Sequence, residues 1–339
     1  MFAGLVFAAA ASISFSGVQP QLAAIGERVY LVFGQGDLIS VARSSDGGET
    51  FSQPSSLPGA GKLALGMHRG PRIAVTSDAV LVAAVAGAKG GGADGDVLLY
   101  RSTDRGTTWL APVAINDVPG SAREGLHALV ASPTGVVVVA WLDLRDKGTR
   151  IYAAVSRDHG ATWAPDALVY ASPSGTVCEC CHPSVAIGAA GQVAIMFRNS
   201  LSGIRDMHLA ESREGVTFTP ARKLGTGSWA LDACPMDGGA ISFSADDVVS
   251  TWRREGDVFL TTDRRAERPL GAGRDPVVAH FKTNRDVAWS ASDGVVLARN
   301  ETTPLSLGRG RFPSLVALKN KTVIAWEHEG QTVVRAIAR

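Results

Sequence analysis

The sequence predicts an all-β protein, a β-propeller of four-stranded antiparallel blades whose ring is closed by an N-terminal strand. Seven blades are favoured, and six are the alternative. One strand pattern recurs along the chain with a period of about 55 residues early and about 37 residues late, and such periods are typical of radial arrays. The composition agrees, because 38 glycines and 19% charged residues suit short strands joined by tight turns.

The first strand of most repeats begins near a proline. Proline is tolerated at the first residue of a strand, where no hydrogen bond of the sheet is lost. These residues therefore mark where the repeats begin: Pro20, Pro71, Pro183, Pro235, Pro276 and Pro313.

The second strand is the clearest element of each repeat. It is a β-branched and apolar run that ends in an aromatic residue in all copies except the one at residues 80–85. Runs of this kind between polar turns predict strands. The other copies span residues 29–33, 137–141, 193–197, 248–252, 287–289 and 323–326.

A polar motif follows the third strand of the early repeats. It reads Ser-x-Asp-x-Gly-x-Thr and then Phe or Trp, starting at Ser44, Ser102 and Ser156, with a shortened copy at Ser212. The Asp and Ser/Thr side chains can bond the backbone of their own turn, the glycine supplies a permissive dihedral angle, and the aromatic ring fills the gap between strands. We interpret the motif as a folding element without a catalytic role.

This motif resembles the Asp-box, or BNR repeat, of sialidases and related propellers. The resemblance is clear over residues 19–220 and depends on the strand pattern alone in the rest of the chain. A sialidase would hold the carboxylate of its substrate with three arginines, attack with a tyrosine that a glutamate activates, and use an aspartate as acid and base.

The two ends of the propeller ring are predicted to meet. Residues 12–16 alternate like a strand, and the chain ends in a third strand at 333–337, so pairing the two would close the ring and remove exposed sheet edges. The single propeller domain then spans 12–339. Residues 1–11 resemble the apolar part of an export signal that lacks its basic segment, which predicts a periplasmic or secreted protein.

The loops that precede first strands or follow second strands should gather at one end of the propeller, opposite the Asp-boxes, because connections alternate between the two ends. We expect this end, the mouth of the central channel, to carry the function. Its candidate ligand-binding residues are five arginines that could hold an anion and one carboxylate: Arg69, Arg198, Arg253, Arg274, Arg311 and Asp143.

All four cysteines fall in mouth loops. Cys181 and Cys234 hold equivalent positions before the first strands of adjacent repeats, so Cys234 should lie near the loop that contains Cys178 and Cys180. One or two disulfides are one interpretation, in an oxidising compartment. The other is a site for one copper or zinc ion, with the four thiolates as ligands and His182 and Met236 as auxiliary ligands. Two further histidines, His68 and His127, are alternatives for the auxiliary positions.

The leading functional hypothesis is an exported propeller that binds a ligand, first of all a soft metal ion, at its Cys/His/Arg-lined mouth. The alternative is an exo-α-sialidase-type glycoside hydrolase with a glycan ligand, but none of the tyrosines falls in a mouth loop, so a catalytic nucleophile is not evident: Tyr30, Tyr100, Tyr152 and Tyr170. A second alternative is a platform for a protein partner.

Other partners are less compatible with the sequence. The net charge is +1 and no run of Lys or Arg exceeds two residues, which argues against nucleic-acid binding. No apolar stretch is long enough to span a bilayer, and we expect a monomer.

Overall fold

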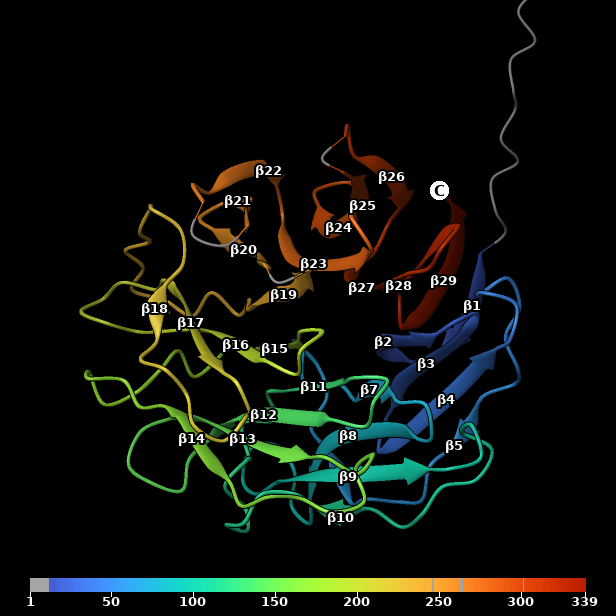
Figure 1. Cartoon of the computed structure of the whole chain (residues 1–339), viewed down its shortest axis with the longest axis horizontal. Helices are drawn as coiled ribbons and strands as arrows, with labels where there is room; N and C mark the ends of the chain where they lie inside the picture. Colours follow the sequence, from blue (N-terminus) through green and yellow to red (C-terminus); the bar gives the residue numbers. More distant parts are fainter. Residues whose placement is uncertain (1–11, 246, 263–264, 301) are drawn as a thin grey trace, which may run out of the picture.

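The computed structural model describes residues 12–245, 247–262, 265–300 and 302–339. These residues form seven four-stranded antiparallel blades around a central channel, which confirms the predicted fold and the larger blade number (Figure 1). The described residues contain no helix, and therefore none that could cross a membrane. The predicted signal segment, residues 1–11, lies outside the described part of the chain.

Each blade runs outward from the channel in chain order. Blade 1 contains β2 (Val18–Ile25), β3 (Arg28–Gln35), β4 (Leu38–Ser44) and β5 (Ser55–Ser56), and blade 2 contains β7 (Arg72–Val75), β8 (Val80–Gly87), β9 (Asp96–Ser102) and β10 (Val113–Ala114). Blade 3 contains β11 (His127–Ala131), β12 (Val137–Asp143), β13 (Arg150–Ser156) and β14 (Ala167–Tyr170). Blade 4 contains β15 (Ser184–Ile187), β16 (Val193–Arg198), β17 (Met207–Ser212) and β18 (Arg222–Lys223). A short strand, β6 (Lys62–Leu63), adds to the far end of β8.

Blades 5 to 7 follow the same order, except that the outer strand of blade 7 comes from the start of the chain. They are β19 (Gly239–Ser244), β20 (Asp247–Arg254), β21 (Asp257–Thr262), β22 (Arg268–Ala272); β23 (Arg274–Phe281), β24 (Asn284–Ala291), β25 (Gly294–Arg299), β26 (Leu305–Gly308); and β27 (Arg311–Ala317), β28 (Lys321–His328), β29 (Gln331–Ala338), β1 (Ile13–Ser16). The first strands of neighbouring blades contact one another around the whole ring, and they line the channel.

The ring closes as the sequence predicts. Strand β1 is the outer strand of blade 7, and it pairs with β29 from Ile13 opposite Val334 to Ser16 opposite Gln331. The first and last parts of the chain thus share one blade, in which β29 is paired on both sides and β1 forms the outer edge.

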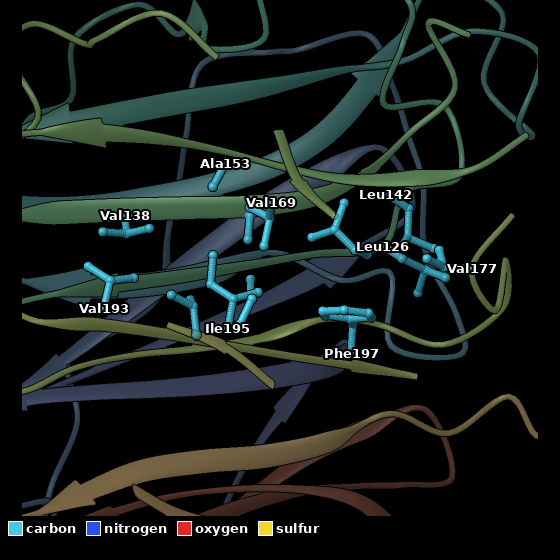
Figure 2. Close-up of a cluster of buried hydrophobic side chains, with 14 of the residues drawn as sticks. Leu126, Val138, Leu142, Ala153, Val169, Val177, Val193, Ile195 and Phe197 are labelled. Carbon is cyan, nitrogen blue, oxygen red and sulfur yellow. The ribbon is translucent and has the colours of Figure 1, made fainter. Parts of the chain in front are cut away.

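The core lies between the blades because each second strand is apolar on both faces. In β12, Val138, Ala140 and Leu142 pack toward blade 4, whereas Val139 and Trp141 pack toward blade 2. Figure 2 shows the cluster between blades 3 and 4, where Val138 lies opposite Val193 and Ile195. Burying each large side chain of this kind stabilises the fold by about 1.5–3 kcal/mol.

The Asp-boxes are self-contained turns. The Asp104 carboxylate accepts hydrogen bonds from the Ser102 hydroxyl (2.8 Å), from the Thr108 hydroxyl (2.6 Å) and from the Thr108 amide (2.9 Å). Gly106 has a φ of +78°, which a residue with a side chain rarely adopts. The Asp, Ser and Thr side chains of the box are therefore bonded within the turn, in agreement with a folding role.

Candidate functional site

The first strands of blades 1, 6 and 7 share one irregularity at the mouth. In each, the sheet register shifts at a residue that precedes a proline: Gln19, Asp275 and Phe312. These residues have φ values of 58°, 55° and 53°, in the left-handed region. A bulge of this kind redirects a side chain. Here Gln19 donates to the Glu327 carboxylate at the mouth (3.2 Å), whereas Asp275 and Phe312 contact His68.

His68 comes from the loop before blade 2 and lies at the axis. Its Nε2 is 2.8 Å from Asp275 Oδ1 of blade 6, across 207 residues of sequence. Its ring stacks on His182 of blade 4 at 4.4 Å and meets the edge of Phe312 at 4.8 Å. Buried Arg72 holds this loop by donating to the backbone carbonyl of His68. Four blades thus meet at one histidine.

Asp237 lies beside this pair and is fully buried. Its Oδ2 accepts a hydrogen bond from the Asp275 amide (3.3 Å) and lies 3.7 Å from Arg253, whereas its Oδ1 has no partner among the described residues. Burial and the charge of Asp275 raise the pKa of Asp237. Burial alone would raise the pKa of Asp275 too, but the hydrogen bond and charge of His68 lower it. The carboxyl group of Asp275 is therefore the more readily ionised of the two.

The four cysteines are free thiols, and the structure brings them together. Cys178 Sγ lies 3.3 Å from Cys181 Sγ and 3.7 Å from Cys180 Sγ. Cys234 approaches from the loop before blade 5 and interacts with Cys180. Met236 packs against the three clustered cysteines. We call Cys178, Cys180, Cys181 and Cys234 the cysteine site.

The cysteine site is buried on one side and open on the other. Cys178 and Cys181 are almost fully buried, whereas Cys234 is exposed. Burial raises the pKa of the Cys181 thiol to about 12, and the hydrogen bond with Cys180 contributes most to raising the pKa of Cys178 to about 11. With such raised pKa values these thiols are protonated at neutral pH, although the charge of Arg198 lowers the pKa of Cys181, so they are poor nucleophiles.

His182 and His127 do not join the thiols. His182 follows Cys181 in the chain but stacks on His68, and its buried Nδ1 has no hydrogen-bond partner among the described residues. His127 begins β11 and is fully buried, with its ring nitrogens 3.2 Å from the carbonyl oxygens of Gly125 and Ala83. Burial lowers the pKa of His127 to about 4.

Arg198 is buried, with 1% of its surface exposed. Its guanidinium donates to the backbone carbonyls of Asp237 (3.2 Å), Arg205 (2.7 Å) and Arg253 (2.9 Å). Each of its nitrogen atoms is directed at the protein's own backbone. The structure therefore places Arg198 as a brace between blades 4 and 5.

Arg69 and Arg253 are also engaged by the protein. Arg69 Nε donates to the carbonyl of Glu124 (2.6 Å), which joins the loops before blades 2 and 3. Arg253 lies over the Trp229 ring at 5.1 Å and near the carboxylate of Asp237. Their side chains have limited freedom to turn toward a ligand.

Arg274 and Arg311 are the most exposed of the five predicted arginines, with 44% and 64% of their side chains accessible. Arg274 Nε lies 3.3 Å from Asp275, and Arg311 pairs with Glu327 at 3.0 Å. Both line an open pocket of about 540 Å³ at the mouth, together with Gln19, Met67 and Phe312.

Asp143 ends β12 and is buried near the rim of blade 3. Its carboxylate accepts hydrogen bonds from Trp141 Nε1 (2.7 Å), from the Ser121 hydroxyl (2.8 Å) and from Arg145 (2.8 Å). These contacts connect the second strand to the loops around it. None of the pockets described above includes Asp143.

The four tyrosines lie in β3, β9, β13 and β14, in the interior or between blades. Tyr170 is the closest to the mouth end of its blade, but its hydroxyl accepts a hydrogen bond from Asn199 (2.9 Å) and its ring packs on Phe197. The structure thus places no tyrosine along the lining of the central channel or in the mouth pocket that Arg274 and Arg311 line.

Sequence reasoning did not single out Gln19, Asp237 or Asp275 as site residues. For Gln19 and Asp275 a signal was present, because each directly precedes the proline of a first strand. Proline at a bulge restricts the residue before it and so directs that side chain. No such sequence signal points to Asp237, since it follows Pro235 by two positions and does not precede a proline.

The comparisons with known proteins agree with the fold. No curated protein matches the chain. An ulvan lyase of a polysaccharide lyase family is similar with a TM-score of 0.59 and 9% identity over 95% of this chain and 94% of that chain. An α-L-arabinofuranosidase of Fusarium graminearum is similar with a TM-score of 0.57 and 11% identity over 97% of this chain and 98% of that chain. A Hadza microbial sialidase is similar with a TM-score of 0.56 and 16% identity over 95% of this chain and 66% of that chain.

The repeats themselves identify the family. The profile of the BNR repeat-like domain matches residues 21–165 and 71–241, a region that contains every Asp-box of the chain. The chain belongs to the BNR repeat-like domain family.

Proposed function

We propose that the protein binds one soft metal ion, Cu(I) or Zn²⁺, at the cysteine site of its mouth. The observation that supports this most is the convergence of three buried sulfur atoms, all within 4.8 Å of one another, with the Cys234 thiol of the next blade interacting with Cys180. Thiolates are the ligands that both ions prefer.

The spacing of the sulfur atoms suits a metal ion. Four thiolates about 2.3 Å from a tetrahedral zinc ion would lie about 3.8 Å apart. The Cys178–Cys180 separation is 3.7 Å and the Cys178–Cys181 separation is 3.3 Å, so small side-chain rotations suffice. Met236 adds a thioether beside the cluster, which favours Cu(I). A bound ion would also keep the thiols reduced in the periplasm or outside the cell, where we propose that the protein works.

The exposed position of Cys234 gives the ion a way in and out. Cys178 and Cys181 are shielded, so exchange with solvent or with a carrier would begin at Cys234. Metal binding must displace protons from thiols whose pKa values are raised, and affinity should therefore fall as the pH is lowered.

The test is a metal titration of reduced, full-length protein. Sulfur-to-metal charge-transfer absorption with Cd²⁺ as the probe should saturate at one ion per chain. Cys181→Ser and Cys234→Ser should each weaken Cd²⁺ binding at least tenfold, although the two residues belong to different blades. Glu179→Gln, an exposed change within the same loop, is the control and should bind within twofold of native protein.

Disulfides are the competing explanation of the same cluster. If the native protein titrates with at most two free thiols, and the serine variants lose stability without changing metal binding, the metal proposal fails. In that case protein that has been reduced before the titration should also show no detectable Cd²⁺ binding.

A glycan is the second candidate ligand, and it would occupy a different place. The open pocket of about 540 Å³ has a mostly apolar surface with Arg274, Arg311 and Glu327 among its lining residues, and Phe312 offers a ring on which a sugar could stack. The similar solved structures include enzymes that act on polysaccharides and arabinosides. Calorimetric titration with acidic oligosaccharides tests this candidate, and Arg274→Ala should weaken any binding observed.

A further inference from the structure

A second cluster of metal-ligating atoms lies at the axis, beside the cysteine site but separate from it. A ring nitrogen of His68 and one carboxylate oxygen each of Asp237 and Asp275 all lie within 4.8 Å of one another. They come from blades 2, 5 and 6 and meet next to the channel, whose cavity of about 150 Å³ is lined by the first strands of all seven blades. We call these three residues the axial site.

Asp237 has a feature that its protein neighbours do not explain. Its side chain is fully buried, yet Oδ1 has no hydrogen-bond partner among the described residues. Buried polar atoms are nearly always paired, and an unpaired carboxylate oxygen indicates a missing ligand or ion. The neighbouring His182 likewise has a buried ring nitrogen without a partner in the described part of the chain.

The backbone holds the axial residues in unusual conformations. Met67 and His68 have φ values of 47° and 69°, and Asp275 has 55°. Such conformations are costly for residues with side chains, and they persist where the surrounding structure enforces them, often at ligand sites. Arg72, which is itself buried, holds the carbonyl of His68 in place. The histidine is thus positioned before any ligand arrives.

We propose that His68, Asp237 and Asp275 bind one divalent first-row transition metal ion, independently of the cysteine site. One imidazole nitrogen and two carboxylates suit ions that accept mixed nitrogen and oxygen ligands, such as Mn²⁺ and Zn²⁺. Ligands about 2.1 Å from such an ion lie roughly 3.0–3.4 Å apart, close to the 2.8 Å between His68 Nε2 and Asp275 Oδ1. In the metal-free protein a hydrogen bond occupies this position.

Four arginines near the site limit its affinity without excluding the ion. Arg72 and Arg198 donate to the backbone carbonyls of His68 and Asp237. Arg253 lies 3.7 Å from Asp237 Oδ2, and Arg274 lies 3.3 Å from Asp275 Oδ1. Asp237 Oδ1 is not the oxygen that faces Arg253, so it stays available. The positive charges favour an ion that also holds an anionic ligand from the mouth pocket, which Arg274 and Asp275 both line.

The two sites are adjacent along two stretches of chain. Cys181 precedes His182, which stacks on His68, and Met236 precedes Asp237. Neighbouring Cα atoms are about 3.8 Å apart, so a soft site and a site of harder ligands lie side by side at the mouth. Three protein ligands leave open coordination positions, as in metal sites that bind a substrate.

The experiment uses Mn²⁺, because thiolates have little affinity for it. Full-length protein titrated with Mn²⁺ and followed by electron paramagnetic resonance should bind one ion per chain. His68→Ala and Asp237→Asn should each weaken binding at least tenfold, with thermal melting as the check on folding. Glu255→Gln, an exposed acidic position at the same end of the propeller, is the matched control and should bind within twofold of native protein.

Spin-echo spectra of native protein provide a readout that needs no variant, since bound Mn²⁺ should show coupling to one histidine nitrogen. The proposal is wrong if native protein binds no Mn²⁺ below about 1 mM, if the nitrogen coupling is absent, or if both variants bind as native protein does. Cys181→Ser should leave Mn²⁺ binding unchanged while it weakens Cd²⁺ binding at least tenfold. Failure of one site is thereby distinguished from failure of the other.

Discussion

Polar side chains are hydrogen-bonded differently at the two ends of the propeller. In the Asp-box that contains Asp158, the carboxylate accepts hydrogen bonds from the Ser156 hydroxyl (2.7 Å), from the Thr162 hydroxyl (2.6 Å) and from the Thr162 amide (2.9 Å), all within seven residues of chain. At the mouth, the thiol of Cys178 bonds to other thiols, and one oxygen of Asp237 has no partner among the described residues.

The difference separates folding chemistry from binding chemistry. The Asp and Ser/Thr side chains of an Asp-box are bonded within their own turn, although the buried indole nitrogens of Trp109 and Trp163 have no partner among the described residues. Such a turn can be repeated from blade to blade. The mouth brings together residues from distant blades, and two of its buried polar atoms, Asp237 Oδ1 and His182 Nδ1, have no partner among the described residues. Incompletely satisfied buried groups are where a ligand can stabilise the protein most.

The largest effect on stability is expected at the buried Arg198 of the mouth. Arg198→Met should lower the free energy of unfolding by about 4 kcal/mol, because it leaves three backbone carbonyls without donors. Arg311→Met, at an exposed arginine, should change it by less than about 0.5 kcal/mol. Urea denaturation measures both. Equal effects would show that Arg198 is not the structural member of the pair.

The ends should also respond to acid in different pH ranges. At the mouth end, burial lowers the pKa of His127 to about 4, so the folded protein favours the neutral ring. The contribution of the neutral His127 ring to the free energy of unfolding is fully present above pH 6.5. As the pH falls toward 4, stability on the order of 3 kcal/mol is lost. Nuclear magnetic resonance of the His127 ring should show a midpoint near 4. A midpoint near 6.5 would contradict the burial.

The Asp-box end should respond only at lower pH. Hydrogen bonds from Thr162 and Ser156 hold the pKa of Asp158 below its usual range, so its contribution is present above about pH 4 and is lost below it. Asp158→Ala should cost about 1 kcal/mol at pH 7 through the lost turn bonds. Its melting curve should then lose part of the acid dependence seen in native protein. A metal-binding defect in this variant would contradict the assignment of the two ends.

The smallest expected signal is sialidase turnover. No release of 4-methylumbelliferone from its sialoside is expected above the rate without enzyme, because the tyrosines lie within blades and not in the mouth pockets described above. Turnover that Arg274→Ala abolishes, with melting unchanged, would make the mouth a hydrolase site.

The sequence predicted the architecture well because propeller strands are local and repeated. The apolar run at residues 137–141 and the strand at 12–16 were both identifiable without a structure, and each has the predicted place. The arrangement of loops at the two ends followed from strand alternation alone.

The site was predictable in part. Equivalent positions before first strands were enough to place Cys234 beside Cys180, but the side-chain directions were not visible. Whether an arginine faces a ligand or its own backbone depends on contacts between blades, as Arg198 shows. The axial site requires residues 68, 237 and 275 to meet, and no local pattern encodes a contact across 207 residues.

The most direct test of the account is the effect of Zn²⁺ on thermal stability. At a free concentration about one hundred times its Kd, an ion that binds only the folded protein stabilises it by about 2.7 kcal/mol. Native protein and Asp158→Ala should therefore both melt higher with Zn²⁺ than without it, whereas Cys181→Ser should show at most a small residual shift from the axial site. Equal shifts in native protein and Cys181→Ser, or no shift in native protein, would contradict the claim that the mouth cysteines bind metal.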